Sequence, residues 1–211
     1  MLRLHDYWRS SAAYRVRIAL ELKKLAYATV PVDLVAGAQR TAENLGVNAQ
    51  GFVPTLVLED GTALTQSLAV LQWLDDTYPE PRFWPADPTS RARATAMALV
   101  IVADIHPIDN LRVLKRIESQ FGADADAKAE WYRHWVSEGL GALEAMAGPG
   151  ICPFLGGDAP GVADICLVPQ LYNARRFDVD LTPYPRLVAA NAAANELPAF
   201  QAATPERARP A

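Results

Sequence analysis

The chain has 211 residues, of which 51% are hydrophobic and 21% are charged, and its formal net charge is -4. A chain of this length can bury a good core, and we expect two small packed domains. The acidic balance gives no basic surface for nucleic acid or anionic lipid, and no apolar run approaches the roughly 18 residues that a membrane span needs. A small molecule is therefore the expected partner of a soluble protein.

The N-terminus and the cysteines indicate the cellular location and the kinds of site that can be expected. Residues 1–6 lead straight into strand-like sequence without the regions of a signal peptide, so we expect a cytoplasmic protein. Cys152 and Cys166 are the only cysteines, too few for a disulfide framework and not spaced as metal ligands. We expect no metal site and two buried structural thiols.

The first 80 residues have the pattern of short strands that alternate with helices. In residues 12–24, Val16 and Leu20 lie at helical spacing, while Arg15 and Arg17 are assigned to the polar face. Strands are expected at 2–5, 27–32, 55–58 and 63–65, and a second clear helix at 67–78. This order predicts an α/β domain over residues 1–80.

A cluster of prolines between residues 78 and 89 marks the end of this domain, since neither a helix interior nor a strand interior accepts them. We place a linker at residues 81–89. Ala-rich helical spacing then dominates residues 90–120, 128–147 and 162–174, which predicts an all-helical second domain over residues 90–211. The tail after Glu206 is expected to be frayed and without function.

Ser10 and Ser11 lie where the first strand meets the first helix, among the unpaired N–H groups at the positive end of the helix dipole. A serine here can serve simply as an N-cap. It can also hydrogen-bond an incoming thiol and stabilise its thiolate. Because the chain has no cysteine at this point, that thiol would come from a ligand, and the residues alone leave both roles open.

Two further segments have ordinary explanations when each is taken alone. Pro54, after Val53, stands at the start of the third strand, where proline is common. Ser67, after Gln66, opens the next helix as a plain cap or as a cap whose N–H groups also hold a carboxylate.

Together, in this order and spacing, these segments resemble the glutathione site of thioredoxin-fold transferases. Residues 8–20, with the sequence WRSSAAYRVRIAL, are similar to the zeta-class signature, usually Ser-Ser-Cys-x-Trp-Arg-Val-Arg-Ile-Ala-Leu. The resemblance continues through residues 104–114, 163–170 and 173–185 and so covers nearly the whole chain. The chain is therefore identified as a member of the zeta-class glutathione transferases, in the group of the maleylacetoacetate and maleylpyruvate isomerases.

The resemblance implies a glutathione transferase fold, in which a thioredoxin-like α/β N-terminal domain is followed by an all-α C-terminal domain, and it implies a homodimer with glutathione as cofactor. It makes Ser10 and Ser11 the catalytic residues beside the glutathione sulfur, without deciding between them. The backbone of Val53 is expected to pair with the cysteinyl part of glutathione, with Pro54 in the cis form. The remaining glutathione contacts that it implies are Gln66 and Ser67 on the γ-glutamyl carboxylate, and Gln39, Gln50, His106 and Asn110.

The resemblance implies that a small dicarboxylic substrate is bound by arginines, and the candidates in this sequence are Arg9, Arg112 and Arg176. Guanidinium groups bind carboxylates in a bidentate manner, although an ordinary surface arginine is simply solvated. Lys115 and Arg116 make a solvated face the competing interpretation for Arg112.

This sequence departs from the signature at two positions and from the family's usual pattern at a third. Ala12 stands where most members have cysteine, so any step that needs a protein thiol there is lost, whereas isomerisation uses the sulfur of glutathione. Tyr14 replaces the tryptophan of the motif, and Gly161 replaces the usual Ser or Thr cap. Glycine is a tolerable N-cap, at a cost of a few tenths of a kcal/mol.

The activity that the resemblance implies is glutathione-dependent cis-trans isomerisation of a maleyl keto acid. Maleylacetoacetate is the first expectation and maleylpyruvate the alternative, and the sequence does not separate them. A transferase that conjugates or dehalogenates small haloacids, and a binding protein without turnover, are the competing hypotheses. The second is disfavoured because the residues of the glutathione motif are intact.

Overall fold

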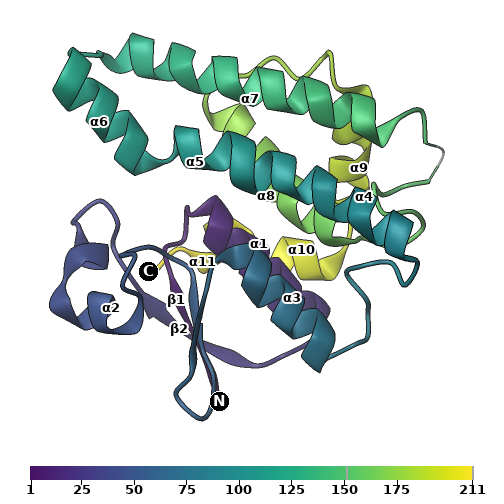
Figure 1. Ribbon diagram of the computed structural model, residues 1–211, viewed down its shortest axis with the longest axis horizontal. Helices are drawn as coiled ribbons and strands as arrows, with labels where there is room; N and C mark the ends of the chain where they lie inside the picture. The colour runs from purple at the N-terminus through teal and green to yellow at the C-terminus, as the bar shows by residue number, and fades with distance from the viewer. Residues whose placement is uncertain (151, 211) are drawn as a thin grey trace. The chain divides into compact units, whose positions relative to one another are not determined.

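The computed structural model describes residues 1–150 and 152–210. The chain divides into two compact units (Figure 1). The first unit combines Met1–Phe83 with the segment that runs from Glu196 to the end of the chain, and the second is Trp84–Asn195.

A four-stranded sheet organises the first unit, with the strands in the order β2-β1-β3-β4. Its strands are β1 (Leu2–Asp6), β2 (Tyr27–Pro31), β3 (Thr55–Val57) and β4 (Ala63–Thr65). β1 runs parallel to β2 and antiparallel to β3, and β3 runs antiparallel to β4. The parallel β1–β2 pair requires a crossover, which α1 supplies.

The helices of this unit are α1 (Ser11–Leu22), α2 (Ala42–Val47), α3 (Ser67–Thr77), α10 (Pro198–Ala202) and α11 (Pro205–Ala208), with a 3-10 turn η1 (Ala38–Arg40). α1 packs against both α3 and α10 (Figure 1). From Ala12 to Leu20 every side chain of α1 is buried, including those of Arg15 and Arg17. The strands and the two clear helices lie within two residues of the predicted bounds, and the α/β class is confirmed, but the assignment of Arg15 and Arg17 to a polar face was wrong.

Every regular element in the described part of the second unit is a helix. These elements are α4 (Pro88–Leu99), a π-helical segment η2 (Val100–Ile105), α5 (His106–Asp109), α6 (Leu111–Phe121), α7 (Ala125–Ala147), α8 (Val162–Arg176) and α9 (Pro185–Asn195). α8 is the centre of the unit: it is buried almost continuously from Val162 to Leu171 and packs against α4 and α9. The helical class predicted for this part of the chain is confirmed.

The long helix expected over residues 90–120 is interrupted at Asn110. This residue has extended backbone angles, with φ -76° and ψ 161°, and its side-chain oxygen accepts hydrogen bonds from the backbone N–H groups of Arg112 and Val113. Asn110 therefore ends one helical stretch and caps the next.

The C-terminal segment differs most from the expectation, because it belongs to the first unit. Phe200 is fully buried, and the Ala203 carbonyl accepts a hydrogen bond from Arg17 Nε at 3.0 Å. The tail beyond Glu206 is partly helical in α11 rather than frayed. The second unit spans Trp84–Asn195, whereas the second domain was predicted over residues 90–211.

Two buried ion pairs hold the first unit together. Arg17 Nη1 lies 2.7 Å from Asp6 Oδ1, and Lys23 Nζ lies 3.1 Å from Asp75 Oδ1. Lys23 also donates to the carbonyls of Tyr78 and Pro81, which fixes the chain where it leaves α3. Within the described residues, no helix has both the length and the apolar character to cross a membrane.

Candidate functional site

The strand register brings three of the predicted segments to one edge of the sheet. His5 of β1 pairs with Thr55 of β3, and Thr55 pairs with Thr65 of β4. The segment after β1, the segment before β3 and the segment after β4 therefore meet at the same edge. These segments contain Ser10 and Ser11, Val53 and Pro54, and Gln66 and Ser67.

Ser10 and Ser11 open α1 at this edge. Ser10 is the N-cap, and its Oγ accepts a hydrogen bond from the Ala13 N–H at 3.2 Å. Ser11 is the first helical residue and is 4% exposed. Because a hydroxyl carries one donor and two acceptor positions, the cap leaves the Ser10 proton able to donate to an anion. The capping role and a thiolate-stabilising role are compatible at this residue.

Arg9 lies against the aromatic side chains of the turn that precedes the serines. Its Nη2 donates to Tyr7 Oη at 3.1 Å, and its Cζ lies 4.9 Å from the centroid of the Trp8 ring and 5.9 Å from that of Tyr7. A hydrogen bond from the Ser10 N–H to the Tyr7 carbonyl, at 2.8 Å, closes the turn. The guanidinium is thus held next to the start of α1.

The Val53–Pro54 peptide bond is cis, and Val53 is 8% exposed. The loop around it is held by the buried Asn48 side chain, whose Nδ2 donates to the Phe52 carbonyl at 3.1 Å and to Thr55 Oγ1 at 3.0 Å. The backbone of Val53 is therefore presented by a fixed loop that leads directly into β3.

Ser67 starts α3 and is itself a hydrogen-bond acceptor. Arg15 Nη1 donates to Ser67 Oγ at 3.2 Å, and both side chains are buried. The N-cap of α3 is Gln66, in a left-handed conformation with φ 67°, so Ser67 is not the cap that the sequence suggested. A buried guanidinium group close to a helix N-terminus favours the binding of an anion.

Gln50 lies close to the start of α3. Gln66 Nε2 donates to Gln50 Oε1 at 2.9 Å. Gly51 has φ +63°, and a Cβ atom on it would lie 2.9 Å from the Gln39 carbonyl oxygen, so glycine allows the turn at Gln39 to approach Gln50. Gln39 Oε1 is buried and has no hydrogen-bond partner among the described residues. Gln39 and Gln50, two of the glutathione contacts that the resemblance implies, thus lie near each other.

The remaining predicted residues belong to the second unit. His106 is the first residue of α5, Asn110 uses its side chain to cap α6, and the Arg112 side chain is exposed. Arg176 ends α8; its Nη1 donates to Asn173 Oδ1 at 3.2 Å, and its Cζ lies 5.7 Å from the Phe177 ring centroid.

Asp109 is a buried ionisable group of the second unit and is not among the predicted site residues. It is 6% exposed, and neither of its carboxylate oxygens has a hydrogen-bond partner among the described residues. Burial raises the pKa of Asp109 to about 7. Nothing in the periodicity of the sequence marks it, because the residue lies on the four-residue α5 and not on a long amphipathic helix.

Metal ligation has no support in the described part of the chain, where no three His, Cys, Asp or Glu side chains gather in a group that could hold an ion. The chemistry offered by the site is anion binding by serine hydroxyls, helix N-termini and guanidinium groups.

Comparison with known proteins identifies the family. Residues 9–77 match the family model "Glutathione S-transferase, N-terminal domain", and residues 112–189 match "Glutathione S-transferase, C-terminal domain". The chain is 49% identical over 208 residues to a protein of Rhizobium meliloti named maleylacetoacetate isomerase, with 98% of this chain and 97% of that protein covered.

Solved structures agree with these matches. One is described as the holo structure of maleyl pyruvate isomerase, a bacterial glutathione-S-transferase in zeta class; it has a TM-score of 0.94 and 40% identity, and 97% of each chain is covered. Another is maleylacetoacetate isomerase of Methylobacterium extorquens AM1 with bound malonate and glutathione. It also has a TM-score of 0.94, with 37% identity and coverage of 99% of this chain and 100% of that chain.

Proposed function

The chain belongs to the glutathione S-transferase family, and we propose that it is a glutathione-dependent cis-trans isomerase of a maleyl keto acid. Maleylacetoacetate is the proposed substrate, and maleylpyruvate is the alternative, since similar proteins carry both names. The observation that carries the proposal is the convergence at one sheet edge of two helix N-termini, the cis Val53–Pro54 loop and the buried Arg15–Ser67 contact.

The residues at this edge fit glutathione, which has a thiol, two carboxylates and peptide groups. The start of α1 with Ser10 and Ser11 suits the thiolate, and the start of α3 with Gln66 and Ser67 suits the γ-glutamyl carboxylate. The backbone of Val53 is proposed to pair with the cysteinyl part. The unpaired, buried Oε1 of Gln39 is an acceptor suited to a ligand N–H, and Gln50, His106 and Asn110 complete the proposed contacts.

In the proposed mechanism, bound glutathione supplies the sulfur nucleophile that adds to the cis double bond and leaves after rotation. Ser10 or Ser11, together with the N-terminus of α1, lowers the pKa of the thiol by donating to the thiolate. Arg9, Arg112 and Arg176 are proposed to hold the carboxylates and to stabilise the enolate-like charge that develops when the double bond becomes single. Ala12 offers no thiol, so the chain itself provides no competing nucleophile at this point.

We also propose a cytoplasmic homodimer. The apolar side chains of α6 support self-association, because the helix has no buried residue, and its Leu111 and Phe121 are 41% and 73% exposed. The two cysteines are free, which is compatible with a reducing compartment.

A spectrophotometric assay of both maleyl keto acids, with and without glutathione, tests the activity. We expect turnover that depends on glutathione.

Arg176→Ala should raise KM for the keto acid about tenfold or more, because a charge-assisted hydrogen bond is lost. The matched control is Arg175→Ala, which removes a neighbouring exposed arginine and should leave KM unchanged.

The variants Ser10→Ala and Ser11→Ala separate the two serines. The variant that raises the thiol pKa of bound glutathione identifies the serine that stabilises the thiolate.

Activity that persists without glutathione would contradict the mechanism. If glutathione binds but neither keto acid is isomerised, whereas chloride is released from a small chloroacid, the chain is a dehalogenating transferase instead. An unchanged KM in Arg176→Ala would remove that arginine from the substrate site and leave the family membership intact.

A further inference from the structure

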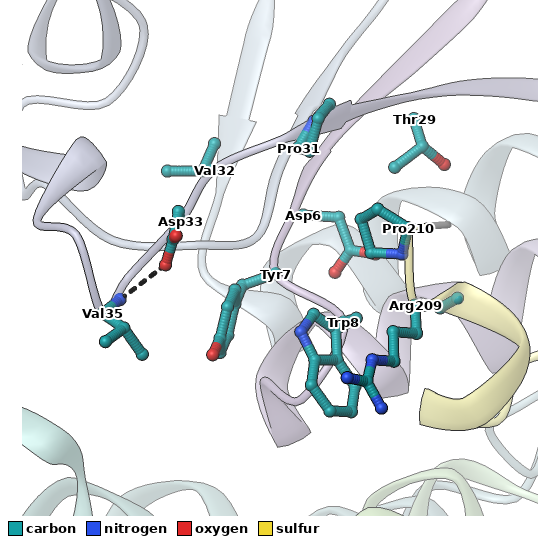
Figure 2. Close-up of a pocket in the computed structure, with 11 residues that line it drawn as sticks. Asp6, Tyr7, Trp8, Thr29, Pro31, Val32, Asp33, Val35, Arg209 and Pro210 are labelled. Carbon is teal, nitrogen blue, oxygen red and sulfur yellow. Dashed lines mark hydrogen bonds between the residues drawn. The ribbon is translucent and has the colours of Figure 1, made fainter.

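The turn before the catalytic serines is contacted by the C-terminal segment. Arg209 places its Cζ 5.1 Å from the centroid of the Trp8 ring, and Arg9 places its own Cζ 4.9 Å from the same centroid. Figure 2 shows Arg209 beside Trp8, and both residues line a cavity of about 340 Å³. One indole ring therefore carries contacts with two guanidinium groups, one from each end of the chain.

The backbone on either side of this contact is fixed by Arg17. Its Nη2 donates to the Trp8 carbonyl at 3.0 Å, and its Nε donates to the Ala203 carbonyl at 3.0 Å. The same guanidinium is paired with Asp6, with Nη1 at 2.7 and 2.8 Å from the two carboxylate oxygens. The buried Arg17 is thus hydrogen-bonded both to the turn and to the C-terminal segment. The contact between Arg209 and Trp8 therefore joins two segments whose backbones are held by the same guanidinium group.

The Trp8 side chain is less constrained than its backbone. It is only half-buried, and the described contacts on its ring come from Tyr7, Arg9 and Arg209. A flat aromatic ring that bears a guanidinium is stabilised by cation–π attraction. Arg209 therefore supplies a constraint on the ring on which Arg9 rests.

We propose that Arg209 is a positioning residue for the substrate site and acts through Trp8 on Arg9. This inference rests on the proposed function, in which Arg9 binds a carboxylate of the keto acid. A guanidinium that is already ordered loses less conformational entropy when its ligand binds, so a fixed Trp8 ring makes Arg9 a better carboxylate binder. The tail, for which the sequence predicted no function, thereby orders the substrate site indirectly, through Trp8 and Arg9.

A double-mutant cycle tests this coupling in the full-length protein. The probe is maleate, whose binding to the glutathione-saturated protein is measured by calorimetry for the wild type, Arg9→Ala, Arg209→Ala and the double variant. We expect Arg209→Ala to weaken maleate binding about two- to fivefold, the size of an exposed cation–π contact, and to raise KM for the keto acid by the same factor. The values of kcat and of KM for glutathione should not change. In the Arg9→Ala background, loss of Arg209 should have no further effect.

Arg207→Ala is the matched control, because it removes an exposed arginine two residues from Arg209 and should leave maleate binding unchanged. An equal loss of affinity in both backgrounds would show that Arg209 acts independently of Arg9 and would overturn the inference. No loss in Arg209→Ala, or a wild type that does not bind maleate, would also overturn it. A wild type that binds maleate but isomerises neither keto acid would overturn the proposed function alone, since the cycle still measures the coupling of Arg209 to Arg9.

Discussion

Several buried charges of this protein have close partners, and one buried carboxyl group has none among the described residues. Arg17 and Asp6 neutralise each other, and Lys23 and Asp75 do the same. Asp109 differs, because both of its oxygens are removed from water without a partner among the described residues, and burial raises its pKa to about 7. A buried carboxylate of this kind costs stability once it ionises.

We therefore predict that ionisation of Asp109 destabilises the fold at neutral and alkaline pH. The folded-state pKa lies above the unfolded value of about 3.9, so the stabilising contribution is complete below pH 4 and is lost as the pH rises through about 7. The isosteric variant Asp109→Asn should match the wild type near pH 4 and exceed it by about 1–3 kcal/mol at pH 8. Urea unfolding at a series of pH values measures this difference.

Asp104→Asn is the control, since Asp104 is an exposed carboxylate of η2, five residues before Asp109 in the chain. Its unfolding free energy should follow that of the wild type at every pH. A wild type and an Asp109→Asn variant with parallel pH profiles would refute the assignment of an unsatisfied carboxyl to Asp109.

At the scale of elements, the second unit depends on the close approach of α7 to η2. These two elements pack together, and Gly139 stands at the contact. A Cβ atom at position 139 would lie 2.3 Å from Ile105 Cγ1 and 2.4 Å from Ile105 Cδ1. Ile105 is itself 1% exposed, so a shift of its side chain would have to take place within the core. Glycine in the interior of this helix is therefore a packing requirement.

Gly139→Ala should destabilise the protein by about 1–3 kcal/mol, because the overpacking outweighs the better helix propensity of alanine. Gly141→Ala on the same helix is a matched control: its added Cβ would meet only Tyr184 Cε1, at 4.0 Å, and propensity should stabilise the protein by about 0.5–1 kcal/mol. Chemical denaturation of both variants measures the two changes. Equal shifts in the same direction would mean that the contact with Ile105 does not limit the packing.

Much of this architecture follows from local sequence patterns, and the exceptions share a cause. Alternation and helical spacing place the strands and α1, α3, α7 and α8 correctly, because the apolar residues of each element recur at the period of its secondary structure. Arg15 and Arg17 were assigned to solvent because a pattern of residue types does not show that Ser67 and Asp6 lie opposite them. The break at Asn110 was missed because asparagine interrupts the apolar spacing no more than any polar residue does. The predicted site residues came from a family motif, whereas Arg209 belongs to no motif.

At the scale of the whole molecule, the first unit is built from both ends of the chain. Phe200 is fully buried, Ala203 is 1% exposed, and α10 packs against α1. The sheet alone cannot supply these contacts, and Arg17 would lose the Ala203 carbonyl as an acceptor without the C-terminal segment.

A chain that ends at Asn195 should consequently lose about 3 kcal/mol or more from the stability of the first unit, the usual cost of removing a buried phenylalanine. A chain that ends at Glu206 retains Phe200 and Ala203 and is the control. Hydrogen exchange of the backbone amides locates the effect: protection should fall in β1 and β3 while α8 keeps its protection. Uniform loss of protection across both units would contradict the separate contribution of the C-terminal segment.

The burial of α10 against α1 also sets an order of events during synthesis. Ribosomes add about 5–20 residues per second, and the entire second unit has to be translated between Phe83 and the start of the returning segment. For a period on the order of ten seconds, the nascent first unit therefore exposes the apolar surface of α1 that Phe200 later covers. This interval is when a chaperone would find its binding surface on the growing chain.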